Sequence, residues 1–270
     1  MRTGRLLGSG RTADVYELHA TETESVPHGR DDLPPAPEAG APAAPARSDA
    51  ADRRTAPAAP LDAAGAWVLR RYRDGWGDAV AEAEVMEYVR GHGYPVPRVR
   101  SATRTEMVLE RLSGPTMLEA FGEGLLDPAR AGAVLAHLLH ALHALPPRGH
   151  APASRVLHLD LHPENVIVTP RGPQVIDWSN AEEGPPGLDW GISAMILAQV
   201  AVDAADSRAS LAHATLASLL AHQSDGLSAL TDSGLAEAGR RRAAMPTMSA
   251  REVELIGAAE ELIRALHRRN

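Results

Sequence analysis

The spacing of apolar residues changes along this chain, from the alternation typical of strands to the spacing typical of helices. Residues 15–18 alternate after a Gly-containing turn, and residues 67–72 read Trp-Val-Leu-Arg-Arg-Tyr, which favours a strand. From about Ser113 the pattern is mostly helical, with leucines recurring on one face at positions 135, 138, 142 and 145. Strands followed by helices predict an α+β chain with a small sheet-rich lobe and a larger helical lobe.

Capping residues predict where several helices begin. Residues 78–92 have helical spacing. Asp127 followed by Pro128 is a typical start, because an N-cap side chain accepts backbone N–H groups and proline suits the first helical position. Ser249 with Glu252 three residues later predicts a capping box. An apolar stripe at positions 255, 259, 262 and 266 is expected to continue that last helix.

A stretch rich in proline and alanine interrupts the predicted strands. Residues 27–60 hold 8 Pro and 11 Ala among 34 residues, and Leu33 is the only large apolar side chain. Such a segment cannot bury enough surface to offset its ordering entropy. We therefore expect a disordered insertion over about residues 21–64, within an N-terminal lobe of residues 1–111. Residues 112–270 are expected to form the C-terminal helical lobe.

Composition excludes several functional classes. The chain has no cysteine, which rules out disulfides and thiolate metal sites. Its net charge of −8 argues against nucleic acid as a partner. The longest apolar stretch, residues 192–202, is too short for a membrane span, and no apolar leader follows the N-terminus. We expect a cytoplasmic protein without a membrane partner.

The strongest chemical signal lies in residues 158–165, His-Leu-Asp-Leu-His-Pro-Glu-Asn, followed by Ile-Asp-Trp at 176–178. Phosphoryl transfer needs a carboxylate to orient the attacking hydroxyl and accept its proton, and oxygen ligands for a phosphate-bound Mg²⁺. Asp160 can supply the first function, and Asn165 with Asp177 the second. A different interpretation is a metal-dependent hydrolase, in which His158, Asp160 and His162 would be the ligands.

These two separated segments resemble the catalytic loop and metal-binding segment of the aminoglycoside phosphotransferase family and its kinase relatives. The resemblance implies a bilobal protein-kinase-like fold that uses ATP and Mg²⁺. It also implies that Asp160 is the catalytic base and that Asn165 and Asp177 hold the metal. Asp189, in Gly-Leu-Asp-Trp, matches a structural aspartate of the family.

Further matches to the family lie in the N-terminal lobe. Gly8, Ser9 and Gly10 resemble a kinase Gly-rich loop, although Ala13 stands at the third glycine position. The next strand carries Arg70 where the family has a lysine that grips the phosphates, and the whole chain contains no lysine.

Arginine can hold a phosphate through two hydrogen bonds, so Arg70 is the predicted phosphate ligand. We expect Glu82 on the following helix to be its partner. Arg71 should face the other side of the strand, because successive side chains alternate. The resemblance also places an adenine-binding hinge at residues 108–112, where Glu110 and Leu112 would contribute backbone groups.

The predicted function is therefore an ATP-dependent phosphotransferase acting on a hydroxyl of a small molecule. Residues 112–270 hold 18 acidic residues and 12 arginines, which suits a cationic acceptor such as an aminoglycoside, amino-sugar or amino alcohol. The alternative is a catalytically silent kinase-like protein that binds nucleotide, suggested by the replacement of lysine by Arg70. The sequence does not indicate an oligomeric state.

Overall fold

The computed structural model describes residues 1–19, 66–73, 76–223, 226 and 228–268. Within these ranges, the N-terminal part is a five-stranded antiparallel sheet with the order β1-β2-β3-β5-β4. The strands are β1 (Arg2–Ser9), β2 (Ala13–His19), β3 (Trp67–Tyr72), β4 (Val99–Ala102) and β5 (Glu106–Glu110). The predicted insertion at about 21–64 lies outside the described residues.

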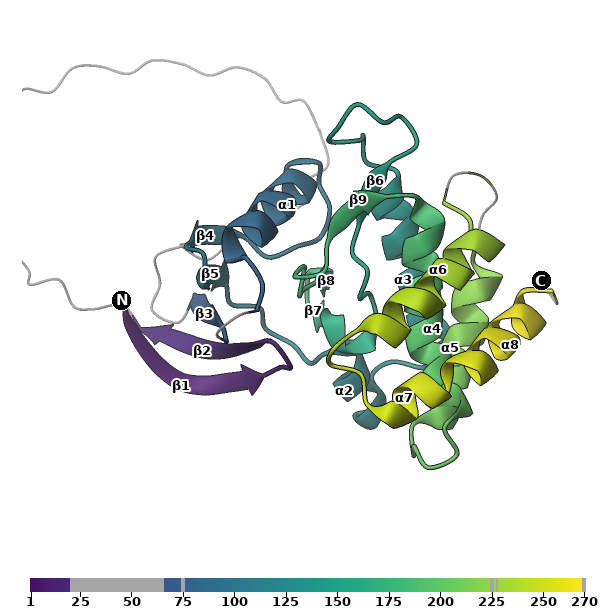
Figure 1. Cartoon of the computed structure of the whole chain (residues 1–270). Coiled ribbons are helices and arrows are strands. Elements are labelled where there is room, and N and C mark those ends of the chain that lie inside the picture. Colours follow the sequence, from purple (N-terminus) through teal and green to yellow (C-terminus); the bar gives the residue numbers. More distant parts are fainter. Residues whose placement is uncertain (20–65, 74–75, 224–225, 227, 269–270) are drawn as a thin grey trace, which may run out of the picture.

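One helix accompanies the sheet. α1 (Ala79–Gly91) begins after Asp78, whose side chain accepts hydrogen bonds from the backbone N–H groups of Val80 and Ala81. The helix packs against β4 and β5 through buried side chains that include Met86 and Val89. Figure 1 shows the sheet and α1 to one side of the helical part.

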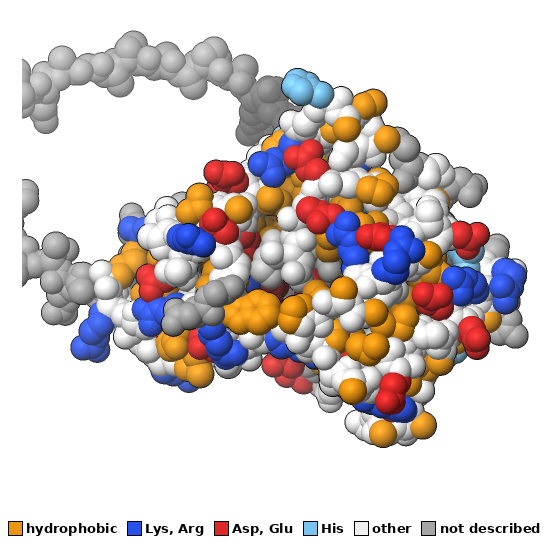
Figure 2. Space-filling model, viewed as in Figure 1, with side chains coloured by type: hydrophobic (Ala, Val, Ile, Leu, Met, Phe, Trp, Pro, Cys, Tyr) orange, Lys and Arg blue, Asp and Glu red, His pale blue; other side chains and the backbone are white. Residues whose placement is uncertain are grey.

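The rest of the chain is mainly helical, as the apolar spacing predicted (Figure 1). Its helices are α2 (Met117–Gly122), α3 (Pro128–His143), α4 (Pro186–Val202), α5 (Ala209–Ala221), α6 (Asp232–Ala244), α7 (Ala250–Glu254) and α8 (Ile256–His267). α4 packs against α3, α5, α6 and α8, which explains why it is apolar on nearly all sides. On the face seen in Figure 2, acidic side chains and arginines are interspersed over this part.

Two short antiparallel ladders lie between α3 and α4 in sequence. They pair β6 (Arg155–Leu157) with β9 (Glu182–Gly184), and β7 (Val166–Thr169) with β8 (Gly172–Val175). A single 3-10 turn, Pro163–Asn165, precedes β7. These ladders carry the segments in which the chemical motifs were found.

The helix starts agree with the capping residues, with one difference. Asp127 caps α3 by accepting from Arg130 N–H, and Ser249 and Glu252 form the predicted capping box. That box begins the five-residue α7, however, and α8 starts separately at Ile256. Among the described residues, no helix has the length and apolar character needed to cross a membrane.

Candidate active site

The loop after β6 and the segment after β8 both adopt unusual backbone conformations. Leu159 has φ 59° and Asp177 has φ 61°, and they are the non-glycine residues with positive φ in the described part of the chain. The left-handed region disfavours side chains with a Cβ, so the surrounding structure must hold these residues there. Leu159 directly precedes the predicted base Asp160, and Asp177 is itself a predicted metal ligand.

Asp160 and Asn165 lie within hydrogen-bonding distance of each other. Asn165 Nδ2 donates to Asp160 Oδ2 at 3.0 Å and to the Asp160 carbonyl oxygen at 2.8 Å. His162 Nε2 lies 3.7 Å from Asp160 Oδ1. Because the Asn165 nitrogen faces Asp160, its amide oxygen is left to bind another group.

The buried carboxylate of Asp189 holds the backbone of the loop that carries Asp160. Asp189 on α4 accepts hydrogen bonds from the backbone N–H groups of His158 at 2.9 Å and Leu159 at 2.7 Å. His143 Nε2 lies 3.0 Å from the same carboxylate. Burial alone would raise the pKa of Asp189, but its bond to His143 and the backbone N–H groups hold that pKa below its ordinary value. The structural position expected for Asp189 is thus present, whereas the sequence had not suggested its partner His143.

His158 is part of the loop's support and is not oriented toward a metal site. Its Nε2 lies 3.1 Å from the Ile176 carbonyl oxygen, and its Nδ1 accepts from Asp160 N–H at 3.2 Å. Burial lowers the pKa of His158, which favours the neutral ring that this pairing requires. The described residues contain no group of three His, Cys, Asp or Glu side chains arranged to hold a metal. This geometry disfavours the hydrolase interpretation.

Arg70 connects the sheet, α1 and the segment after β8. Its Nη1 donates to Glu82 Oε1 at 2.6 Å, and its Nη2 donates to Asp177 Oδ1 at 2.6 Å. The expected pairing with Glu82 is present, while the direct contact with Asp177 was not foreseen. Glu82 also accepts from Tyr72 Oη and from Trp178 N–H at 2.9 Å.

Arg70 stabilises the charges of the two carboxylates in this buried network, although burial still raises the pKa of Glu82 above its ordinary value. Burial alone would lower the pKa of Arg70, but Glu82 and Asp177 hold it above its ordinary value. Burial likewise disfavours the charged form of Asp177, yet Arg70 and the Ser179 hydroxyl lower the pKa of Asp177 below its usual range. Asp177 is therefore ionised at neutral pH.

Asp177 and Asn165 provide oxygen atoms suited to Mg²⁺. This hard cation prefers carboxylate and amide oxygens and usually completes its shell with water and substrate phosphates. Asp177 Oδ1 is engaged by Arg70 and Ser179, which leaves Oδ2 for a metal. The residues present thus fit a magnesium ion shared with a nucleotide.

The Gly-rich segment forms the turn between β1 and β2. Gly10 N–H donates to the Ala13 carbonyl oxygen at 2.9 Å. Ser9 Oγ donates to Asp14 at 2.7 Å, and Arg73 donates to both Ser9 Oγ and Asp14. These bonds hold the turn beside β3, while a Cβ added at Gly8 would meet nothing within 4 Å. The open space at Gly8 permits a close approach by a ligand.

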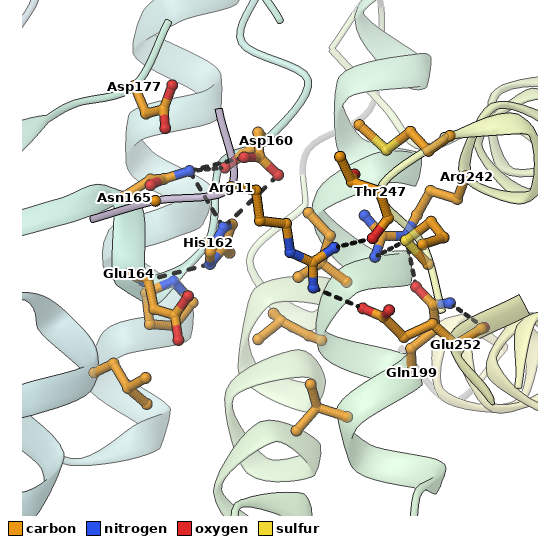
Figure 3. A pocket seen from close by; sticks show the side chains of 18 of the residues that line it. Arg11, Asp160, His162, Glu164, Asn165, Asp177, Gln199, Arg242, Thr247 and Glu252 are labelled. Carbon is orange, nitrogen blue, oxygen red and sulfur yellow. Dashed lines mark hydrogen bonds and ion pairs between the residues drawn. The ribbon is translucent and has the colours of Figure 1, made fainter. Parts of the chain in front are cut away.

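Residues of this turn line a cavity of about 1020 Å³. Ser9, Gly10, Asp160, Asn165 and Asp177 line it, so most of the predicted catalytic and loop residues meet there. Gly8, Arg70, Glu82, Glu110 and Leu112 do not line it. Its opposite wall comes from α4, α5, α6 and α7, and the close-up in Figure 3 shows part of this wall.

The predicted hinge lies apart from the cavity. Glu110 ends β5, and its N–H donates to the Arg98 carbonyl oxygen at 2.8 Å, so this donor is already used within the protein. The Glu110 carboxylate accepts from Arg171 at 2.7 Å. Among the described residues, the backbone N–H of Leu112 has no hydrogen-bond partner. Leu112 thus retains a free donor at the expected position.

Three cavity residues had no signal in the sequence: Arg11, Gln199 and Arg242. Arg11, in the Gly-rich turn, donates to the Thr247 carbonyl oxygen at 2.9 Å and to Glu252 at 3.1 Å, which Figure 3 shows as a bridge across the cavity. Arg242 reaches Gln199 from α6. Their partners lie far away in sequence, so only the folded chain reveals them.

Comparison with known proteins supports the resemblance stated from the sequence. A model of the phosphotransferase enzyme family matches residues 122–219, a span that contains Asp160, Asn165 and Asp177. This match confirms the resemblance over that part of the chain. No curated protein matches the sequence.

Two solved structures match this chain. A thermostable mutant of aminoglycoside phosphotransferase APH(4)-Ia, in a ternary complex with AMP-PNP and hygromycin B, matches with a TM-score of 0.50 and 13% identity, covering 99% of this chain and 94% of that chain. Amicoumacin kinase hAmiN in complex with AMP-PNP, Ca²⁺ and Ami matches with a TM-score of 0.47 and 14% identity, covering 76% and 85%. The first similarity confirms the predicted α+β, kinase-like fold.

Proposed function

We propose that this chain transfers the γ-phosphate of ATP to a hydroxyl group of a small molecule. The observation that carries this proposal is the meeting of Asp160, Asn165 and Asp177 in one cavity that Ser9 and Gly10 of the Gly-rich turn also line. These side chains come from two separate segments, and each has the chemistry that phosphoryl transfer requires. The family match over residues 122–219 supports a phosphotransferase at the general level.

In the proposed reaction Asp160 orients the acceptor hydroxyl and accepts its proton. The bond from Asn165 Nδ2 fixes the Asp160 carboxylate, leaving Oδ1 toward His162. Asp177 and Asn165 would hold Mg²⁺, which supplies positive charge next to the nucleotide phosphates. Arg70 contributes a second, permanent positive charge beside Asp177. The Gly-rich turn at Gly8 to Gly10 would approach the phosphates, and the free N–H of Leu112 would meet the adenine.

The cavity's wall suggests the class of acceptor. Besides Asp160 and Asp177, four carboxylates line it: Glu164, Asp203, Asp206 and Glu252. Each of these four also pairs with an arginine, namely Arg11, Arg208 or Arg251. An acceptor that carries amino groups, such as an aminoglycoside, amino-sugar or amino alcohol, would find further hydrogen-bond acceptors in these carboxylates. The volume of about 1020 Å³ is at the upper end of small-molecule pockets, which suits an acceptor together with a terminal phosphate.

One observation favours a second candidate, a nucleotide-binding protein without turnover. Arg70 Nη2 contacts Asp177 Oδ1 directly, so a cation already neutralises the predicted metal ligand. A silent protein would bind ATP with stoichiometry near one and show no acceptor-dependent consumption. The retained set of Asp160, Asn165 and Asp177 argues for the active enzyme.

The test is an ATP-consumption screen over aminoglycosides, amino-sugars, amino alcohols and nucleosides, with Mg²⁺ present. For any accepted substrate, Asp160→Ala should lower kcat by about 10²–10⁴, since it removes the positioned base. Asp177→Ala should cause a comparable loss. The control is Asp232→Ala, an exposed carboxylate at the start of α6 and remote from this cavity, which should retain turnover. Near-normal turnover by Asp160→Ala would contradict the assignment.

A further inference from the structure

Arg242 differs from the other arginines around the cavity. It lies in the last turn of α6 and lines the cavity, yet it is only 8% exposed. Arg11 pairs with Glu252, and Arg208 pairs with Asp206. Arg242, by contrast, has no carboxylate within ion-pair distance in the part of the chain that the structure describes.

The hydrogen bonds of Arg242 leave much of its guanidinium available. Its Nε donates to Gln199 Oε1 at 2.5 Å. Its Nη2 lies 3.5 Å from Met248 Sδ, a weak acceptor, and neither Nη group reaches an oxygen atom of a described residue. Two strong donors therefore lie at the cavity wall without a matching acceptor.

Gln199 holds the guanidinium in place. The Gln199 side chain is itself buried, at 4% exposure, and its Nε2 donates to the Glu252 carbonyl oxygen at 2.6 Å. This second bond determines which end of the amide faces Arg242, so the oxygen must point to Nε. Figure 3 shows Arg242, Gln199 and Glu252 linked in this way beside the cavity. The arrangement fixes the fork of Nη groups before any ligand arrives.

An unpaired buried charge needs compensation from elsewhere. Burial lowers the pKa of Arg242, and the carboxylates of Asp160 and Glu252 counteract this effect through space. Arginine nevertheless stays charged in proteins. Without a direct counterion, the guanidinium carries a desolvation cost that an anion in the cavity would relieve.

We propose that Arg242 binds a carboxylate group of the acceptor, so that the acceptor is a hydroxy acid, in particular a hydroxylated amino acid or an amino-sugar acid. This inference rests on the proposed phosphotransferase function and narrows its acceptor class. The planar fork of Arg242 matches the two oxygens of a carboxylate. The acidic residues on the same wall would receive an amino group of the same molecule, and Asp160 its hydroxyl.

The test compares acceptors that differ only in the carboxylate. Suitable pairs are serine with ethanolamine, homoserine with 3-aminopropanol, and 2-amino-2-deoxygluconate with 2-amino-2-deoxyglucitol. Binding to the full chain in the presence of AMP-PNP and Mg²⁺ is measured by calorimetry, and phosphate transfer is measured with ATP. The acid should bind about ten- to a hundred-fold more tightly than its partner in at least one pair, as expected for a charge-assisted bidentate contact.

Variants then locate the contact. Arg242→Gln should abolish the preference for the acid, whereas Arg242→Lys should retain part of it. Arg240→Gln makes the same change two residues earlier on α6, where Arg240 pairs with Glu237 outside the cavity, and should leave the preference intact. If the wild-type protein binds both members of every pair equally, or if Arg242→Gln keeps the preference, the inference is wrong.

The wild-type comparison decides the matter even if Arg242→Gln fails to fold. The experiment can also refute the carboxylate site and the kinase activity independently of each other. A preference for the acid without phosphate transfer to any acceptor would support the carboxylate site and refute the kinase activity. Transfer only to the partners that lack the carboxylate would support the kinase activity and refute the carboxylate site.

Discussion

Arg70 and Arg71 are neighbours on β3 with opposite surroundings. Arg70 is buried and contacts Glu82 and Asp177, while Arg71 is largely exposed and pairs with Glu106 on β5. Arg70→Ala would leave two carboxylates without their partner, and we expect a loss of about 3–5 kcal/mol in the free energy of unfolding. Arg71→Ala breaks an exposed pair and should cost less than about 1 kcal/mol. Urea unfolding of both variants measures this contrast.

The same two substitutions should also differ in their effects on the kinetics of phosphate transfer. Arg70→Ala should raise the KM for ATP and lower kcat, together on the order of ten- to a hundred-fold, because the permanent positive charge beside Asp177 is lost. Arg70 also lowers the pKa of Asp177. Without Arg70, Asp177 takes up a proton at higher pH, so activity on the acid side should be lost at a higher pH than in the wild type. Equal kinetic effects of Arg70→Ala and Arg71→Ala would contradict this assignment.

The sequence could predict spatial proximity only for residues that are close in sequence or lie on one regular element. Asp160 and Asn165 are five residues apart, and alternation along a strand sufficed to separate Arg70 from Arg71. The pairing of Arg70 with Glu82 came from the resemblance. The contact of Arg11 with Glu252 joins residues 241 positions apart, and no local pattern encodes such a distance. Arg242 could not be distinguished from Arg240 and Arg241 because its burial depends on how α6 packs.

At the scale of elements, α3 and α5 approach closely at Gly132. A Cβ at Gly132 would lie 2.4 Å from the Thr215 carbonyl oxygen and 2.7 Å from Leu219 N, both backbone atoms. Gly132→Ala should therefore destabilise the fold by about 1–3 kcal/mol through overpacking, despite the better helix propensity of alanine. Thermal or urea unfolding gives the difference directly.

Gly257 on α8 provides a matched control, at which the same substitution should change the stability in the opposite direction. Its added Cβ would meet nothing within 4 Å. Gly257→Ala should therefore stabilise the protein, by about 0.5–1 kcal/mol, because alanine loses less backbone entropy in a helix. A stabilising effect at both positions would show that α3 and α5 can move apart. The sequence predicted both segments as helical but could not tell which glycine lies in a contact.

At the scale of the whole molecule, the strands on either side of the insertion are already neighbours. β2 and β3 pair antiparallel, with Glu17 opposite Val68. Because the end of β2 lies beside the start of β3, a short Gly-containing turn can connect them. Replacing residues 21–64 by such a turn should leave the melting temperature within a few degrees. A large decrease, or loss of soluble expression, would show that the segment contributes to the fold.

Arg11 joins the two parts of the molecule across the cavity. It extends from the Gly-rich turn to the Thr247 carbonyl oxygen and to Glu252 on α7 (Figure 3). Both ends of the Arg11–Glu252 pair are partly exposed, so Arg11→Ala should cost less than about 1 kcal/mol in global stability. Its effect should instead be local opening, because each segment loses a partner on the far side of the cavity.

Hydrogen exchange distinguishes these two effects. In Arg11→Ala, amide exchange should become faster both at residues 8–13 and at residues 245–253. Arg5→Ala is the matched control, because Arg5 pairs with Glu17 inside the same sheet and should alter exchange only in β1 and β2. Unchanged exchange at residues 245–253 in Arg11→Ala would mean that α7 is held in place by its capping box and by Gln199 alone. Faster exchange at both segments would mean that the Gly-rich turn and α7 close over the cavity together.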